Sequence, residues 1–352
     1  MRFCEYAMSQ PQFLGIEIGG TKLQVAIGAD AGPPLTAVAR GEVDPAGGAE
    51  GILAEIERLA HGLLADHPAS AVGIGFGGPV DRAGRVVKSH HVHGWDGFQL
   101  TDWARERFGL PAVVANDADT AALAEARLGA GRGANPVFYI TVGTGIGAGL
   151  VVDGRIYRGH GVSVTELGHL RPGLQAEGPD QILESYAAGW GIAAAAQSRL
   201  RDPMRYRLGE LSVNRRRPED IRQRLIEIEE AGEADAGNLL DRCDGQPEHL
   251  STKLVVEAAA AGNGIAAEIL RQAWQALGWG IAQAITLLSP EVVVIGGGVS
   301  LAGRELFFEP LEREVARYVF PPLLDSYRIV PASLGEEVVL HGALILASEL
   351  PR

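Results

Sequence analysis

Two glycine-rich hairpins, about 120 residues apart, constrain the fold of this chain more than any other feature. In the first, apolar runs at residues 13–18 and 23–27 flank a Gly-Gly-Thr-Lys turn. In the second, apolar runs at residues 137–142 and 148–152 flank a Gly-Thr-Gly turn. Apolar runs joined by such turns predict β-hairpins, and their recurrence predicts two related domains.

The remaining segments alternate between strand and helix patterns. Short apolar runs that end at glycine or at Asn-Asp predict strands, whereas apolar residues at helical spacing predict helices. The sequence therefore predicts an α/β fold. Residues 200–250 differ, because basic and acidic runs there predict a charged helical insertion on the surface. The expected strands are residues 71–76, 112–115 and 291–295, and the expected helices are residues 49–66, 118–128, 252–288 and 340–349.

Composition narrows the class of protein. With 352 residues, 46% of them hydrophobic, the chain can form two domains with proper cores. A formal net charge of −13 argues against a general nucleic-acid binder and fits a cytoplasmic enzyme. Cys4 and Cys243 offer no disulfide framework. No apolar stretch is long enough to span a bilayer, so we expect no membrane partner.

Both hairpin turns have the chemistry of phosphate-binding loops. A tight glycine turn exposes backbone N–H groups, and threonine hydroxyls add hydrogen-bond donors. Neither turn has the spacing of a Walker loop, and neither leads from a strand into a helix as a dinucleotide-binding turn does. Two such turns on corresponding strands indicate a nucleotide held between the domains. The turns comprise Gly19, Gly20, Thr21 and Lys22 in the first hairpin, and Thr144 and Gly145 in the second.

Asn116 and Asp117 stand where an expected strand meets an expected helix. Both residue types are favoured helix N-caps, so capping alone is one interpretation. The other interpretation is catalytic: a carboxylate at a strand end could accept the proton of a hydroxyl that attacks phosphorus. The residues themselves leave both interpretations open.

Two further motifs have polar or glycine-rich character. Glu166 and His169 would share a face if their segment were helical, and with Glu184 they could bind sugar hydroxyls or form a polar surface turn. A zinc site is less favoured, because no cysteine or second histidine lies nearby in the sequence. Gly296, Gly297 and Gly298 follow an expected strand and could lie against an adenine ring or form an ordinary turn.

In their order along the chain, these motifs resemble the ROK family (repressors, open reading frames and sugar kinases), within the actin and hexokinase fold. The resemblance runs from about Phe13 to the C-terminus. It implies two actin-like (ribonuclease H-like) domains with a cleft between them. The implied boundaries are residues 12–125, with a C-terminal helix at about 338–352 packing back on them, and residues 126–337.

The resemblance also implies roles for individual residues. Asp117 matches the catalytic base, and Asn116 matches its sugar-binding neighbour. ATP and Mg²⁺ are the implied cofactors, with Mg²⁺ near Glu17. The implied sugar ligands also include Gly77, Gly78, Pro79, Glu166, His169 and Glu184, and the implied nucleotide ligands are Gly19, Gly20, Thr21, Lys22, Thr144, Gly145, Gly296, Gly297 and Gly298.

Three departures from the family pattern stand out. Glu17 occupies the position of the usual aspartate, which could alter metal geometry or slow turnover. Many members carry a zinc loop with several cysteines after the histidine. This chain has no cysteine between His169 and Glu184, so we expect no structural zinc. A histidine cluster at residues 90–93 replaces the family's asparagine before Gly94-Trp95, and a solvated loop is favoured over an adventitious metal site.

The combined interpretation is a kinase that phosphorylates a hexose, with glucose as the first choice. Kinases for an N-acetylhexosamine or for fructose are alternatives, and polyphosphate is an alternative phosphate donor. A sugar-sensing repressor is disfavoured, because the few residues before the first strand are too short for a helix-turn-helix domain. A silent sugar-binding protein is favoured only by Glu17. The sequence does not decide between a monomer and a homodimer.

Overall fold

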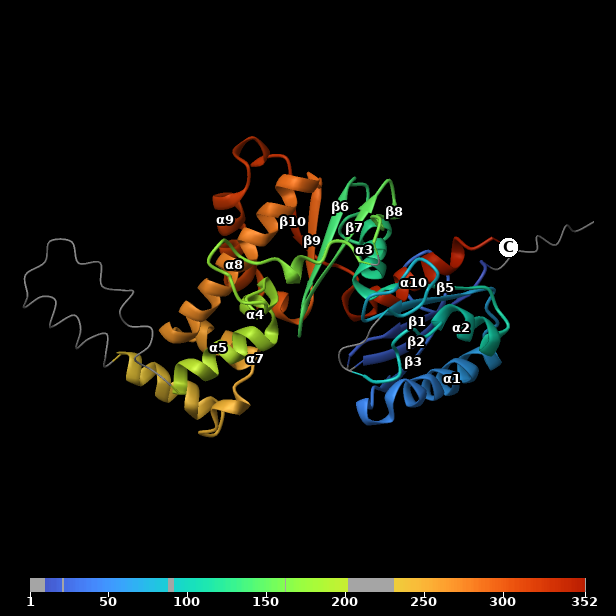
Figure 1. Cartoon of the computed structure of the whole chain (residues 1–352), viewed down its shortest axis with the longest axis horizontal. Coiled ribbons are helices and arrows are strands. Elements are labelled where there is room, and N and C mark those ends of the chain that lie inside the picture. Colours follow the sequence, from blue (N-terminus) through green and yellow to red (C-terminus); the bar gives the residue numbers. More distant parts are fainter. Residues whose placement is uncertain (1–9, 21, 88–91, 162, 202–230, 352) are drawn as a thin grey trace, which may run out of the picture.

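Figure 1 shows the computed structural model of the chain, which describes residues 10–20, 22–87, 92–161, 163–201 and 231–351. The described elements form two halves, each built around a five-stranded sheet. None of the described helices is long and apolar enough to cross a membrane.

The first sheet contains the first predicted hairpin. Strands β1 and β2 pair in antiparallel register, and β3 pairs antiparallel with β2. Strands β4 and β5 continue the sheet in parallel, which gives the order β3-β2-β1-β4-β5. The bounds are β1 Phe13–Ile18, β2 Lys22–Gly28, β3 Ala37–Glu42, β4 Val72–Phe76 and β5 Ala112–Asn116. Helices α1 (Gly48–Asp66) and α2 (Leu100–Phe108) belong to the same half.

The second sheet repeats this topology. Strands β6 and β7 form the second predicted hairpin, β8 pairs antiparallel with β7, and β9 and β10 continue in parallel. Its order β8-β7-β6-β9-β10 matches the first sheet strand for strand, as expected for a repeated domain. The bounds are β6 Val137–Val142, β7 Ile146–Val152, β8 Arg155–Ile156, β9 Val292–Gly296 and β10 Arg328–Pro331.

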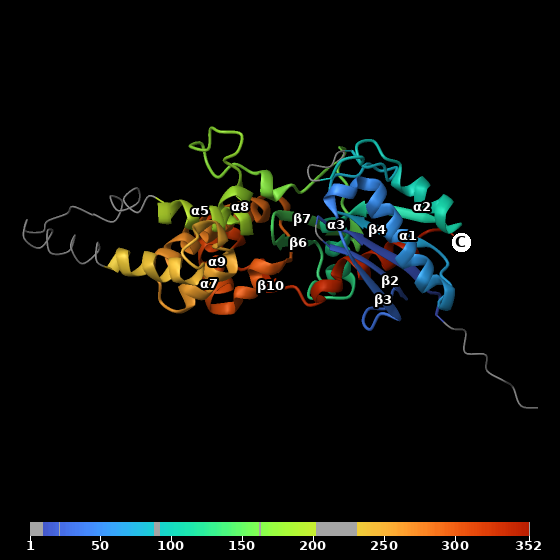
Figure 2. The same cartoon turned by 90° about the horizontal axis from the view of Figure 1, so that it is seen from below.

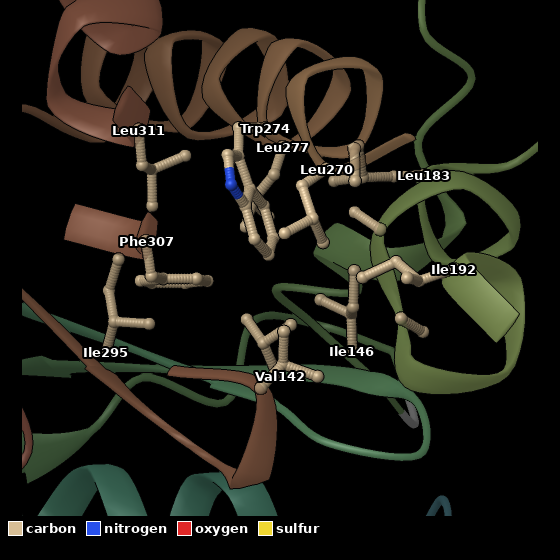
Figure 3. Packing of buried hydrophobic residues seen from close by; sticks show 14 of the residues in the cluster. Val142, Ile146, Leu183, Ile192, Leu270, Trp274, Leu277, Ile295, Phe307 and Leu311 are labelled. Carbon is tan, nitrogen blue, oxygen red and sulfur yellow. The ribbon is translucent and has the colours of Figure 1, made fainter. Parts of the chain in front are cut away.

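A helical layer covers one face of the second sheet (Figures 1 and 2). Trp274 and Phe307 pack edge to face with ring centroids 4.7 Å apart, between α8 and the sheet (Figure 3). The Trp274 indole N–H donates to the carbonyl of Leu306 at 2.8 Å, so the buried ring leaves no unpaired donor. The helices are α4 Leu183–Ala187, α5 Gly189–Arg201, α7 Thr252–Ala260, α8 Gly264–Leu288 and α9 Glu309–Tyr318.

The helical region expected at residues 252–288 is confirmed, but it consists of two helices, because the chain breaks between α7 and α8. Gly262 adopts φ 88°, a left-handed conformation that ends α7. The Asn263 side chain then accepts a hydrogen bond from the backbone N–H of Ala266 at 2.9 Å and caps α8. Of the expected insertion at 200–250, residues 231–242 are helical and 202–230 lie outside the described residues.

Helices α3 (Asp117–Arg127) and α10 (Val338–Ser348) connect the two halves. Helix α3 follows β5 of the first sheet but packs on β6 and β7 of the second, whereas α10 follows β10 and packs on β1 and β4 of the first. The two helices also pack on each other. The domain boundaries inferred from the sequence remain a prediction.

Glycines make this central packing possible. A Cβ atom added at Gly342 of α10 would lie 1.9 Å from the carbonyl oxygen of Thr120 in α3. One added at Gly73 of β4 would lie 1.9 Å from the carbonyl oxygen of Ala343. At both places backbone meets backbone, so no side-chain movement can relieve the overlap.

Replacing Gly342 with alanine tests this packing. We expect Gly342→Ala to destabilise the protein by about 1–3 kcal/mol or more, because the methyl group forces the two central helices apart. The control is Gly62→Ala in α1, where an added Cβ meets nothing within 4 Å. That change is expected to stabilise by up to about 1 kcal/mol through helix propensity. Thermal unfolding measures both, and equal melting temperatures for the two variants would contradict the packing argument.

Candidate active site

A cavity of about 390 Å³ lies where the N-terminal ends of α3 and α10 face the ends of β1, β6 and β9. It brings together residues from three of the predicted motifs: Glu17 and Lys22, Asp117, and the triple glycine at residues 296–298. The motifs are far apart in the sequence, and the crossing of α3 and α10 places them around one space. The other lining residues are Ala118, Ala121, Tyr139, Thr141, Ile295, Ser300, Leu301, Phe308, Pro331, Ala332, Gly335, Glu336, Val338 and Val339.

Glu17 is a buried charged group of this cavity. Its carboxylate accepts a hydrogen bond from the buried Gln24 amide at 2.7 Å, and the Lys22 ammonium lies 3.9 Å away. Burial raises the pKa of Glu17, and Lys22 and Gln24 oppose that rise. Lys22 also donates to the carbonyl oxygen of Glu336 at 2.7 Å, which ties the first hairpin to the segment before α10.

Asp117 is the first residue of α3 and lines the same cavity. Its carboxylate accepts a hydrogen bond from the backbone N–H of Ala118 at 2.8 Å. Burial nevertheless raises the pKa of Asp117 to about 6, and the charge of Glu166 adds to the rise. A carboxylate with a pKa near neutrality is suited to exchange a proton with a substrate at physiological pH.

Asn116 caps α3, so the capping interpretation is correct for this residue. Its side-chain oxygen accepts from the backbone N–H groups of Ala118 and Asp119, at 2.9 and 3.2 Å. Its side-chain nitrogen donates to the carbonyl oxygen of Gly78 at 3.1 Å. One amide therefore fixes both the start of α3 and the glycine loop after β4.

That loop lies close to the catalytic candidate. The backbone N–H of Gly77 donates to the carbonyl oxygen of Ile18 at 2.7 Å. A Cβ atom added at Gly77 would lie 3.4 Å from a carboxylate oxygen of Asp117. The Gly77-Gly78-Pro79 loop and Asp117 are thus neighbours, as the sequence-based roles require.

The central residue of the triple glycine, Gly297, has no room for a side chain. Gly297 adopts φ 89°, and an added Cβ would lie 2.5 Å from the carbonyl oxygen of Val142 in β6. Residues 296–298 line the cavity, and a side chain at position 297 would be both strained and in collision with β6.

None of the sugar-ligand candidates lines this cavity: Asn116 and the Gly77-Gly78-Pro79 loop lie outside the lining, and so do Glu166, His169 and Glu184. Glu166 precedes a short 3₁₀ turn that ends at His169. The carboxylate and the imidazole are 4.0 Å apart, and their side chains are 50% and 67% exposed. Glu184 accepts a hydrogen bond from the backbone N–H of Ile146 at 2.8 Å, and a Cβ atom added at Gly145 would lie 2.6 Å from its carboxylate. Glu184 therefore lies against the second glycine turn.

Four of the predicted phosphate-loop residues are also not among the lining residues: Gly19, Gly20, Thr144 and Gly145. Thr21 lies outside the described residues, as do His90 and His91 of the histidine cluster. His93 is described, and its ring packs against Gly48 at the start of α1.

Sequence reasoning missed several residues of the cavity. Tyr139 is buried in its wall, and burial raises the pKa of its hydroxyl. Its position on the first strand of the second hairpin predicts only that it is a buried strand residue, not that it lines a cavity. Gly335 and Glu336 precede α10 and carry no motif. They reach the cavity because α10 packs on the first sheet.

Asp119 is a third carboxylate near the cleft that the motifs did not reveal. Burial raises its pKa to about 7, the Arg158 guanidinium lowers it, and the charges of Glu166 and Asp117 raise it further. One of its carboxylate oxygens is buried and has no hydrogen-bond partner.

The family model described as ROK family matches residues 13–350 of this chain. The chain belongs to the ROK family. It is 29% identical to a glucokinase of Thermotoga maritima, over 97% of this chain and 99% of the relative. It is 30% identical to a glucokinase of Streptomyces coelicolor, over 96% of this chain and 97% of the relative.

Solved structures extend this similarity to the fold. A ROK family glucokinase from Streptomyces griseus, in complex with glucose and AMPPNP, matches with a TM-score of 0.75 and 30% identity, covering 96% of this chain and 100% of that one. A ROK hexokinase from Thermus thermophilus matches with a TM-score of 0.72 and 27% identity, covering 96% and 98%. The chain thus has two actin-like α/β domains.

The raised pKa of Asp117 can be measured directly. In protein with ¹³C-labelled aspartate, we expect the Asp117 carboxyl resonance to titrate with a midpoint at about pH 6. Glu166→Gln is expected to lower that midpoint only slightly, because burial is the main cause of the shift. A midpoint near the ordinary aspartate value of 3.8 would contradict the enclosed environment.

Proposed function

We propose that this chain, an ATP-dependent sugar kinase of the ROK family, transfers the γ-phosphate of ATP to glucose and releases glucose 6-phosphate. One observation carries the proposal most strongly. A single cavity is lined by the candidate base Asp117, by Glu17 and Lys22 of the first hairpin, and by the triple glycine. The two glucokinases with 29% and 30% identity over nearly the whole chain support glucose as the sugar.

In the proposed reaction, Asp117 accepts the proton of the sugar hydroxyl as that oxygen attacks the γ-phosphorus. Its pKa of about 6 means that most molecules carry the basic form at neutral pH. Asn116 keeps Asp117 in place by capping α3 and holding the loop at Gly78. Position and charge, more than covalent chemistry, lower the barrier of phosphoryl transfer.

We assign the sugar to the side of Asp117 that faces Gly77, Gly78 and Pro79. The other proposed sugar ligands are Asn116, Glu166, His169 and Glu184. Glu166 influences the pKa of Asp117, which places their charges close enough to interact. Closure of the two halves would bring these groups around the sugar and exclude water, which limits hydrolysis of ATP.

We assign the nucleotide to the remainder of the cavity. The adenine would stack near residues 296–298, and the phosphates would extend toward Lys22, the Gly19-Gly20 turn and Thr144-Gly145. Lys22 offers a cation at this point, and backbone N–H groups of the two turns offer further donors.

Mg²⁺ fits the donors at the phosphate end of the cavity. The ion prefers one or two carboxylates together with phosphate oxygens, and Glu17 and Asp117 both line the cavity. Glu17 would hold the ion, directly or through water, and the ion would neutralise charge on the transferred phosphate.

Two alternatives remain within the same reaction class. A putative fructokinase of Bacillus subtilis is 25% identical over 95% of this chain, so fructose is the second candidate sugar. A polyphosphate/ATP-glucomannokinase from Arthrobacter matches at 25% identity with a TM-score of 0.57, so polyphosphate is the second candidate donor. The space along residues 296–298 favours a nucleotide, because polyphosphate has no planar ring to fill it.

The alternative outside the enzymes is a sugar-binding protein without catalytic activity. A xylose repressor of Caldicellulosiruptor bescii is 22% identical to this chain, over 78% of this chain and 61% of the repressor. The raised pKa of Asp117 favours the kinase, because a sensor has no use for a base that titrates near neutrality. We propose the cytoplasm as the location, since ATP and free hexose meet there.

A sugar panel tests the reaction. With ATP and Mg²⁺, coupled ADP release is expected with glucose at a higher kcat/KM than with fructose, mannose, N-acetylglucosamine or N-acetylmannosamine. Repeating the assay with polyphosphate in place of ATP tests the donor. No ADP release with any of these sugars would favour the silent sugar-binding protein.

Asp117→Asn tests the base. The amide is nearly isosteric but cannot accept the proton, so kcat is expected to fall by about 10²–10⁴-fold while sugar binding is retained. Calorimetric titration with glucose measures binding, and ADP release measures turnover. Asp96→Asn serves as the matched control, because Asp96 lies outside the cavity lining. A kcat near the wild-type value in Asp117→Asn would exclude Asp117 as the base.

Glu17→Gln tests the proposed metal contact. The substitution keeps the size of the side chain but removes its charge. We expect the Mg²⁺ concentration for half-maximal activity to rise about tenfold, while glucose affinity in the absence of nucleotide stays unchanged. An unaltered Mg²⁺ dependence would show that Glu17 does not act on the metal.

A further inference from the structure

A second cavity is lined by the same two central helices as the first, but by residues toward their C-terminal ends. Its volume is about 540 Å³. The nucleotide cavity is lined by the first turns of α3 and α10, whereas this one is lined by Leu123 and Arg127 of α3 and by Leu346 and Glu349 at the end of α10. Arg155, Ile156 and Arg158, in and just after β8, complete its lining. Figure 1 shows α3 and β8 side by side where the two halves meet.

Three arginines in one cavity are unusual for a chain with a formal net charge of −13. Arg127 is already engaged: it donates to the carbonyl oxygen of Gly154 at 2.8 Å and pairs with the Glu349 carboxylate. Arg155 is exposed, and no hydrogen bond or ion pair with another described residue engages its side chain. Arg158 is half-buried, and its charge lowers the pKa of Asp119.

The cavity therefore holds more positive than negative charge. Glu349 balances Arg127, and it is the only carboxylate among the lining residues, so no lining carboxylate is left for Arg155 and Arg158. The floor formed by Leu123, Ile156 and Leu346 is apolar, so an anion there would be less screened than in open water. Guanidinium groups have the planar fork that binds two oxygens of a phosphate at once.

We propose that this cavity binds the phosphate group of a small molecule through Arg155 and Arg158, at a site separate from the nucleotide cavity. The phosphate group could belong to free inorganic phosphate or to a phosphorylated sugar, since both present the same oxygens. This site does not depend on the proposed kinase reaction.

A ligand in this cavity would contact both halves of the molecule. It would touch α3 and α10, which connect the two halves, and the segment after β8. It would also compete with Asp119 for Arg158. The next residue, Gly159, accepts a hydrogen bond from Arg82, which lies just after the Gly77-Gly78-Pro79 loop. The cavity is thus linked to the sugar side of the cleft through the chain from Arg158 to Gly159 and the hydrogen bond between Gly159 and Arg82.

The test is calorimetric titration of the whole chain with inorganic phosphate and, separately, with glucose 6-phosphate. AMPPNP is present throughout, so that the nucleotide cavity is filled. We expect wild-type protein to bind at least one of the two probes. We expect Arg155→Gln combined with Arg158→Gln to weaken that binding at least about tenfold, because two charge-assisted hydrogen-bonding groups are lost.

Arg132→Gln is the matched control, because Arg132 is exposed, has no side-chain partner among the described residues and lies outside the cavity. It is expected to bind as wild type does. If inorganic phosphate binds, the free ion is enough to occupy the cavity. If only glucose 6-phosphate binds, the ligand is a phosphorylated sugar. Either result supports the proposal when the double variant loses that binding. Failure of both probes to bind wild type, or equal binding by the double variant, would overturn the proposal.

Discussion

The backbone contact between α3 and α10 is the constraint on which the rest of the structure depends. Gly342 lets α10 meet the Thr120 carbonyl of α3, and Gly73 lets the first sheet meet α10. On the other side, a Cβ atom added at Gly149 of β7 would lie 2.7 Å from Ala122 of α3. Each central helix is thereby pressed onto the sheet of the opposite half, and the N-terminal ends of both helices reach the same cavity.

This arrangement gives the cleft its electrostatic character. Asp117 can line the cavity because α3 begins there, and Glu336 can contact Lys22 because α10 begins beside the first hairpin. Burial raises the pKa of both Glu17 and Asp117, because burial disfavours the charged form of each carboxyl group. Such strain at a cavity is typical of functional sites, where a substrate or metal ion supplies the missing counter-charge.

Much of the fold could be predicted from local patterns. The two hairpins appear as β1–β2 and β6–β7. They were predictable because two apolar runs joined by a short glycine turn pair with each other as antiparallel strands. The break between α7 and α8 was missed, since the apolar spacing continues across Gly262 and Asn263 and only their capping geometry stops the helix. Strand β10 was missed because four residues on a sheet edge give little periodicity.

The site was predictable only where a motif carries its own chemistry. Glu17, Lys22, Asp117 and the triple glycine belong to motifs far apart in the sequence, and they line one cavity. Tyr139 and Gly335 could not be predicted, because they reach the cavity through packing between segments about 200 residues apart. The double use of the Asn116 amide, as helix cap and loop anchor, likewise needed the three-dimensional structure.

The most direct test of the account is a crystal structure of the chain with AMPPNP and glucose bound. The account predicts the adenine against residues 296–298, the phosphates near Lys22 and Glu17, and one glucose hydroxyl oxygen within about 3 Å of the Asp117 carboxylate. A nucleotide bound outside this cavity, or a glucose with no hydroxyl in reach of Asp117, would contradict it.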